Sequence, residues 1–129
     1  MKEALFDARL SPMNIDYVHL HGTGTIDNDL AEARAIHALF GDRSLPPLSS
    51  IKGSVGHSLA AAGAMGAVVS ALSITHDIVP SNTGFHESDP ELRLTPVVQP
   101  TEAKLNTVLV NAFGFGGTNA TLIIRNFSG

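Results

Sequence analysis

The chain has 129 residues and a mass of 13.5 kDa, the size of one domain with a buried core. Hydrophobic residues make up 43% and charged residues 16%, which is typical of a globular protein and not of a disordered one. Eight Lys and Arg against 12 Asp and Glu give a formal charge of −4 with no basic run, which argues against nucleic acid or a membrane surface as partner. The absence of cysteine excludes a disulfide, a thiolate zinc site and a cysteine nucleophile from this chain.

The first third of the chain predicts a helix, a strand and a second helix. Residues 2–10 are typical of the end of a helix, and Ile15–Leu20 is β-branched and aromatic, as strands are. Apolar residues recur at helical spacing over 29–40. Asp29 and Glu32 fit a capping box, so this helix is expected to begin at Asp29.

A charge-free stretch from Gly53 to His76 follows a short strand predicted at 48–51. It predicts a helix over 57–76, and it is long enough to cross a bilayer. Because it contains several His, Ser and Thr, a small-residue helix in a soluble protein is the simpler interpretation. With no signal sequence, the cytoplasm is the expected location. The small-residue stripe of this helix consists of Gly63, Ala67 and Ala71.

The last third predicts a β-hairpin that displays a loop. Residues 108–112 and 120–125 have strong β character, and the segment 113–119 between them is rich in glycine. Turn residues dominate from 79 to 95. The order of elements predicts a single α/β domain over residues 1–129, with a mixed sheet layered with helices.

The first candidate site is the segment 19–25, His-Leu-His-Gly-Thr-Gly-Thr, at the end of a predicted strand. Strand periodicity places His19 and His21 on one face if the strand continues. With Asp27 and Asp29 they could ligate a metal, as in an amidohydrolase, although 129 residues cannot build the barrel that such enzymes need. A turn with one structural histidine is the alternative.

The second candidate site is the segment 50–57, Ser-Ile-Lys-Gly-Ser-Val-Gly-His. A histidine at a helix N-terminus faces the positive end of the helix dipole, which disfavours imidazolium. We therefore expect His57 to be a neutral donor and His21, at a strand end, to be freer to charge. Lys52 could orient the site; a surface lysine beside a capping histidine is the alternative.

The third candidate site is the loop 111–119, in which Gly114, Gly116 and Gly117 leave backbone N–H groups available. Phe115, flanked by glycines, is either a gate over an apolar tunnel or a plug of the core. Spacing alone leaves both interpretations open.

Taken together and in this order, the three segments resemble the C-terminal part of a β-ketoacyl synthase of the thiolase-like fold. The resemblance covers nearly the whole chain. It rests on residues 17–25 with Asp29 and Glu32, residues 52–57 with 61–63, and residues 111–119.

In that family, decarboxylative Claisen condensation joins an acyl chain held on a Cys to malonyl carried by an acyl carrier protein. The resemblance implies that His21 and His57 stabilise the enolate and assist loss of the carboxylate, and that Lys52 keeps the histidines in the right tautomer. It implies that Phe115 is a substrate gate whose loop, with Gly114, Gly116 and Gly117, contributes to an oxyanion hole. His19 has no catalytic counterpart, and no cofactor or metal is implied.

The chain departs from the family in two ways. The nucleophilic Cys lies in the family's N-terminal half, and this chain corresponds to about the last third of such an enzyme. Gly66 stands where many members carry a glutamate that pairs with the lysine, so Lys52 must pair with another carboxylate, such as Glu32, or remain unpaired. A glutamate placed at position 66 is then expected to raise activity.

These departures define the expected behaviour of the isolated chain. Alone it should be inactive and should expose apolar surface, so its expected partners are acyl carrier protein and either an N-terminal ketosynthase half or a second copy. A non-catalytic partner subunit, like a chain-length factor, is the alternative function.

Overall fold

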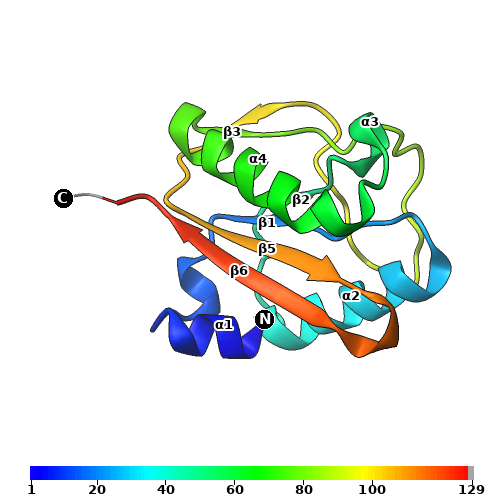
Figure 1. Cartoon of the computed structure of the whole chain (residues 1–129), viewed down its shortest axis with the longest axis horizontal. Helices are drawn as coiled ribbons and strands as arrows, with labels where there is room; N and C mark the ends of the chain where they lie inside the picture. Colours follow the sequence, from blue (N-terminus) through cyan, green and yellow to red (C-terminus); the bar gives the residue numbers. More distant parts are fainter. Residues whose placement is uncertain (128–129) are drawn as a thin grey trace.

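The computed structural model describes residues 1–127 and centres on a four-stranded mixed sheet of order β2-β1-β5-β6 (Figure 1). Strand β1 pairs in parallel with β2 and with β5, whereas β6 is antiparallel to β5. The strands are β1 (Tyr17–His19), β2 (Leu48–Ser49), β5 (Thr107–Phe113) and β6 (Asn119–Arg125). The predicted α/β class and the C-terminal hairpin are both confirmed.

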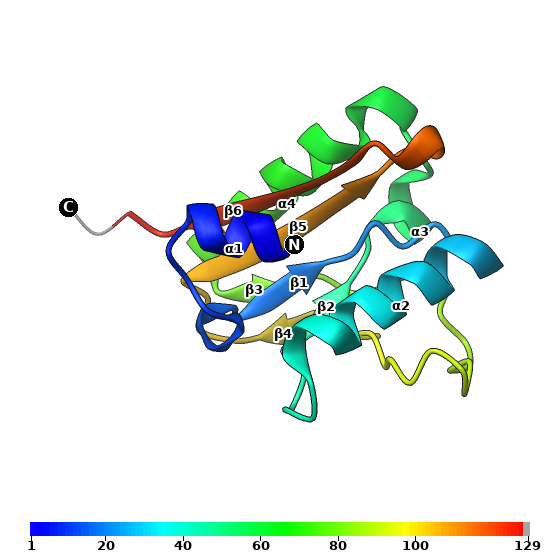
Figure 2. The ribbon, with the colours of Figure 1, turned by 90° about the horizontal axis from the view of Figure 1, so that it is seen from below.

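Helices cover both faces of this sheet (Figures 1 and 2). Helix α4 (Ala62–His76) lies on one face, and α1 (Lys2–Asp7) and α2 (Ile26–Phe40) lie on the other. The smaller elements are α3 (Lys52–Val55), the 3-10 turns Pro12–Asn14, Leu59–Ala61 and Phe115–Gly117, and an antiparallel pair of β3 (Ile78–Val79) and β4 (Thr101–Glu102).

Two apolar clusters fill the space between the layers, because neighbouring residues of a strand point to opposite faces. On β5, Leu109 joins the cluster under α2, while Val108 and Val110 join the cluster under α4. Both β1 and β5 are fully buried over these positions. This packing fixes the carboxyl ends of β1, β2 and β5 at one edge of the sheet.

The predicted start of the second helix was wrong. Helix α2 begins at Ile26, and its N-cap Thr25 makes no side-chain capping bond. Asp29 and Glu32 therefore form no capping box, because the Glu32 carboxylate is turned toward the sheet.

The predicted helix over 57–76 was also wrong at its start. The chain forms α3, then an irregular segment that contains His57, then a 3-10 turn, and only at Ala62 does α4 begin. His57 therefore does not open a helix. The strands predicted at 15–20 and 48–51 are both shorter, because the chain leaves the sheet at Leu20 and at Ser50.

Helix α4 has a small-residue face, but not the predicted one. Its buried residues are Gly66, Ser70 and Ser73, whereas Ala71 is exposed.

The segment Leu59–His76 is long and apolar enough to cross a membrane, with a mean hydropathy of 1.5. In the described chain 17% of this segment is buried. Length and composition are weak evidence for a span, since a core helix passes the same test. The outer face of α4, with Val68 and Leu72, is left without a partner among the described residues.

Candidate active site

The predicted site residues gather where β1, β2 and β5 end. His21 follows β1, Lys52 follows β2, and Phe113 ends β5. Because these three strands are parallel, their carboxyl ends meet at one edge of the sheet, which is where open α/β sheets place ligands. Residues separated by more than 90 positions in the sequence are thereby brought into contact.

Three side chains form the centre of the site. The His21 and His57 rings lie edge to face with centroids 5.5 Å apart, and the His21 ring also packs against Phe113 at 5.6 Å. The Lys52 ammonium donates to the backbone carbonyl of His21, and its Nζ lies 3.4 Å from His21 Nδ1. The predicted grouping of His21, Lys52 and His57 is thus present in the structure.

The partners of the two Nδ1 atoms define the histidine tautomers. Leu59 N–H donates to His57 Nδ1 at 3.0 Å. Because an ammonium has no acceptor, its contact with His21 requires His21 Nδ1 to accept. In the neutral rings, the proton of both histidines is therefore on Nε2, so that each offers one N–H donor.

The charges around His21 keep it neutral. Burial, and then the positive charge of Lys52, lower the pKa of His21 to about 4. The expectation that His21 is the freer histidine to charge was wrong, because the strand end is buried and not solvated. Burial also lowers the pKa of Lys52, against the opposing effect of Glu32 and Asp29.

The Glu32 carboxylate holds the backbone that follows β1 through hydrogen bonds. Its carboxylate is 2% exposed and accepts hydrogen bonds from the N–H groups of His21 and Gly22, both at 2.9 Å, and from the Asn111 side chain at 2.9 Å. Burial raises the pKa of Glu32, and these donors oppose the rise. Among the described residues Lys52 has no ion pair with Glu32, and its partner is instead the His21 carbonyl.

Position 66 faces the sheet, and Gly66 itself has no side chain to pair with Lys52. A Cβ at Gly66 would lie 3.1 Å from Val110 Cγ1 and 3.2 Å from the His19 ring. The His19 imidazole is 3% exposed, and neither ring nitrogen has a hydrogen-bond partner within residues 1–127. This tight approach argues against the expectation that glutamate at 66 would complete the site, because its first side-chain atom would already press on His19 and Val110. His19 is a packed residue of the sheet, in keeping with its predicted structural role.

The glycine-rich loop is displayed and is not part of the core. Phe115 is fully exposed, so of the two interpretations the core plug is excluded. Gly114 N–H donates to Thr118 O at 2.8 Å and closes the loop, while Gly116 and Gly117 have φ values of 79° and 85° that side-chain-bearing residues rarely adopt.

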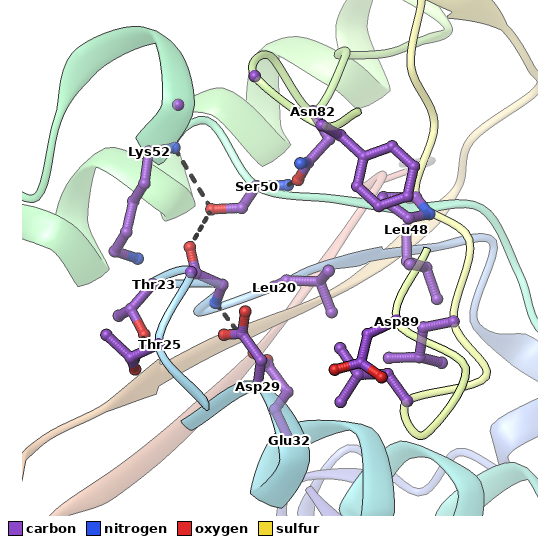
Figure 3. Close-up of a pocket in the computed structure, with 18 of the residues that line it drawn as sticks. Leu20, Thr23, Thr25, Asp29, Glu32, Leu48, Ser50, Lys52, Asn82 and Asp89 are labelled. Atoms are coloured by element: carbon purple, nitrogen blue, oxygen red, sulfur yellow. Dashed lines mark hydrogen bonds between the residues drawn. The ribbon is translucent and has the colours of Figure 1, made fainter. Parts of the chain in front are cut away.

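Lys52 and His57 also line a pocket of about 550 Å³ (Figure 3). Its wall combines polar residues, such as Thr23 and Asn82, with apolar ones such as Leu94. Sequence reasoning missed Asn82, which was read as part of a turn-rich segment. In the part of the chain that the structure describes, no group of three or more His, Asp or Glu could hold a metal ion, which leaves the metal interpretation without support.

Solved structures with a similar fold include ones described as ketosynthases. The chain superposes on the structure described as the ishigamide ketosynthase/chain length factor with a TM-score of 0.94, at 37% identity, over 98% of this chain and 32% of that one. A second, described as a type II PKS acyl-carrier protein in complex with its ketosynthase, gives a TM-score of 0.94 at 31% identity, over 98% and 32%. These matches confirm the thiolase-like fold, and this chain covers about a third of each matched chain.

Sequence comparison identifies the family. Residues 1–86 match the family model described as beta-ketoacyl synthase, C-terminal domain, and the chain therefore belongs to the beta-ketoacyl synthase family. It is 42% identical over 126 residues to the 3-oxoacyl-[acyl-carrier-protein] synthase 2 of Coxiella burnetii, a match that covers 96% of this chain and 30% of that protein. The chain thus spans about a third or less of the proteins it matches.

Proposed function

We propose that this chain supplies the enolate-forming part of a 3-oxoacyl-[acyl-carrier-protein] synthase active site. The observation that carries the proposal is the tautomer pair: His21 and His57 both accept at Nδ1, so both Nε2–H groups are free to donate. Two such donors near one point stabilise the negative charge that develops on a thioester oxygen.

The proposed reaction is decarboxylative. The bond between the malonyl methylene and its carboxylate breaks, carbon dioxide leaves, and the electron pair moves onto the thioester enolate. The Nε2–H groups of His21 and His57 hold the enolate oxygen. The enolate carbon then attacks the acyl thioester carbonyl, and the cysteine thiolate that carried the acyl group leaves.

Lys52 is proposed to orient His21 and not to transfer a proton itself. Its ammonium bridges the carbonyl and Nδ1 of the same residue, which holds the ring in the Nε2–H tautomer. After burial, the charge of Lys52 is the next largest cause of the low His21 pKa of about 4, which keeps His21 neutral at pH 7.

The cysteine must come from outside this chain, which has none. We propose that an N-terminal ketosynthase half provides it, that acyl carrier protein delivers the substrates, and that the Phe115 loop gates them. Phe115 is fully exposed, and the glycines around it are exposed as well. This exposure supports a loop that lies at an interface with the N-terminal half or with acyl carrier protein. The cytoplasm remains the predicted location.

A non-catalytic role beside a ketosynthase, as in a chain-length factor, is the second candidate. It is favoured by the missing cysteine and by the likeness to a structure described as a ketosynthase/chain length factor. In that case the chain would change the product length of a partner without condensing substrates itself.

The test uses a complete ketosynthase in which these 129 residues form the C-terminal part. The amide nitrogen of Gln reaches the position of Nε2, whereas that of Asn reaches the position of Nδ1. We therefore expect His57→Asn to lower kcat for malonyl decarboxylation about a hundredfold and His57→Gln to lose less. Carbon dioxide release and condensation are both measured.

Equal rates for His57→Asn and His57→Gln would contradict the Nε2–H assignment. A complete protein that neither decarboxylates nor condenses, but alters the products of a partner ketosynthase, would establish the second candidate.

A further inference from the structure

Ser50 connects the three chain segments that build the site. Its Oγ accepts a hydrogen bond from Lys52 N–H at 3.3 Å and donates to the carbonyl of Gly22, also at 3.3 Å. Its own N–H donates to Asn82 Oδ1 at 2.8 Å (Figure 3). Ser50 is 3% exposed, so none of these groups can exchange its partner for water without a local opening.

The approach between these segments is close. A Cβ at Gly22 would lie 2.7 Å from Ser50 Cβ, so the turn after His21 rests directly on Ser50. A movement of Ser50 is therefore passed to the His21–Gly22 backbone on one side and to Lys52 on the other.

Asn82 is itself held in place. Its N–H donates to Val97 O at 2.6 Å, and Val97 N–H donates to Leu48 O at 2.9 Å, which ties the segment to β2. The next residue, Thr83, accepts from the Ser54 hydroxyl at 2.7 Å, and its carbonyl occupies the place of a Cβ at Gly53. The Asn82 side chain is thus a fixed acceptor that faces the start of the Lys52 turn.

We propose that Asn82 is a positioning residue of the active site, which through Ser50 sets the place of the Lys52 ammonium relative to His21. Its action on the site runs through its bond to Ser50 N–H. This inference rests on the proposed function above, because only an enolate-binding His21 gives the Lys52 contact a catalytic purpose.

The variant Asn82→Leu keeps the shape of the side chain and removes the acceptor of Ser50 N–H. The Lys52 turn is then free to shift, and the contact of Lys52 with His21 weakens. The charged or titratable groups that act on His21 are Lys52, His57 and Asp29. A weaker Lys52 contact reduces the second largest cause of the low pKa of His21, after burial, so the His21 pKa should rise.

The experiment compares nitrogen-15 NMR titrations of the His21 ring in this chain for the unaltered protein, Asn82→Leu and Asn82→Asp. Asp retains the acceptor oxygen and should keep His21 in the Nε2–H tautomer. Asn106→Leu, which removes an exposed amide at the opposite end of the sheet, is the control and should change nothing. In a complete ketosynthase, Asn82→Leu should lower kcat about tenfold with KM unchanged.

Ser50→Ala gives an independent test if Asn82→Leu does not fold. It keeps the bond from Ser50 N–H to Asn82 and removes the hydroxyl that joins Ser50 to Lys52 N–H and to the Gly22 carbonyl, so it breaks the next link of the same path and should move the His21 titration in the same direction. A His21 titration that is the same in Asn82→Leu or Ser50→Ala as in the control would overturn the inference. If the complete enzyme does not condense at all, the proposed function fails, while the NMR comparison still decides the role of Asn82.

Discussion

His19 is a buried histidine that carries an energetic cost. Both ring nitrogens lack hydrogen-bond partners within the described residues, and the ring packs against Gly66 and Val110 at the centre of the sheet. Burial and the nearby charge of Lys52 lower the pKa of His19 from 6.5 to about 4. A neutral ring tolerates this place, whereas an imidazolium does not.

The first prediction concerns stability against pH. Between pH 6.5 and 4 the unfolded chain binds more protons at His19 than the folded chain, so the free energy of unfolding falls as pH is lowered through this range. The loss from His19 should reach about 2 kcal/mol by pH 4.5, and His21 adds to it in the same direction. His19→Phe should remove that part of the pH dependence, as measured by urea unfolding at pH 7, 5.5 and 4.5. An equal pH dependence in His19→Phe would show that His19 does not carry it.

At the scale of elements, the seat of α4 on the sheet depends on its glycines. Gly66 lies so close to Val110 and His19 that a methyl group would be in tight contact at 3.1 to 3.2 Å. Gly63, one turn earlier, would bring its Cβ only to 3.4 Å from Ala112, which is an ordinary contact. The two positions differ in what packs beneath them and share the same helix.

The second prediction uses this matched pair. Gly66→Ala should destabilise the chain by about 1–3 kcal/mol through overpacking, because the strands beneath it are fully buried. Gly63→Ala should stabilise it by up to about 1 kcal/mol, because alanine favours helix. Urea unfolding of both variants measures the difference. Gly66→Glu, with a buried carboxylate, should be less stable still and should not raise activity; equal gains in stability at both positions would refute the packing argument.

At the scale of the whole molecule, two surfaces are left uncovered in the described chain. The outer face of α4 exposes Val68 and Leu72 at 60% and 50%, and Leu59 before it at 78%. Strand β6 pairs with β5 on one side only, so its other edge presents free backbone groups. Apolar patches and open edges of this kind are typical of interfaces.

The third prediction follows from these surfaces. The isolated chain should show no condensation activity, because it has no nucleophile to hold the acyl group. Light scattering should show that the isolated chain self-associates. An added N-terminal ketosynthase half that carries the cysteine should replace the self-associated species with a complex of the two parts and restore activity. A stable monomer that ignores the added half would contradict the assembly, and condensation by the chain alone would contradict the mechanism.

The sequence by itself determined the α/β class and the hairpin at 108–125, and the resemblance carried by its motifs implied the grouping of His21, Lys52 and His57. It could do so because these features depend on local patterns: strand-forming residues around a glycine-rich loop, and motifs whose residue types and order are distinctive. That this chain has no cysteine is likewise read from the sequence alone.

Only the tertiary structure decided which hydrogen bonds connect these groups. The spacing of Glu32 predicts a helix cap, but its carboxylate instead accepts from the backbone N–H groups of His21 and Gly22, which lie eleven and ten residues earlier. The Lys52 ammonium donates to the backbone carbonyl of His21, and a pattern of side chains in the sequence cannot predict a partner in the backbone. Asn82 reaches Ser50 across 32 positions. Such contacts arise from the pairing of distant strands and the burial it imposes, so their energy is absent from any local segment and appears only when the whole chain has folded.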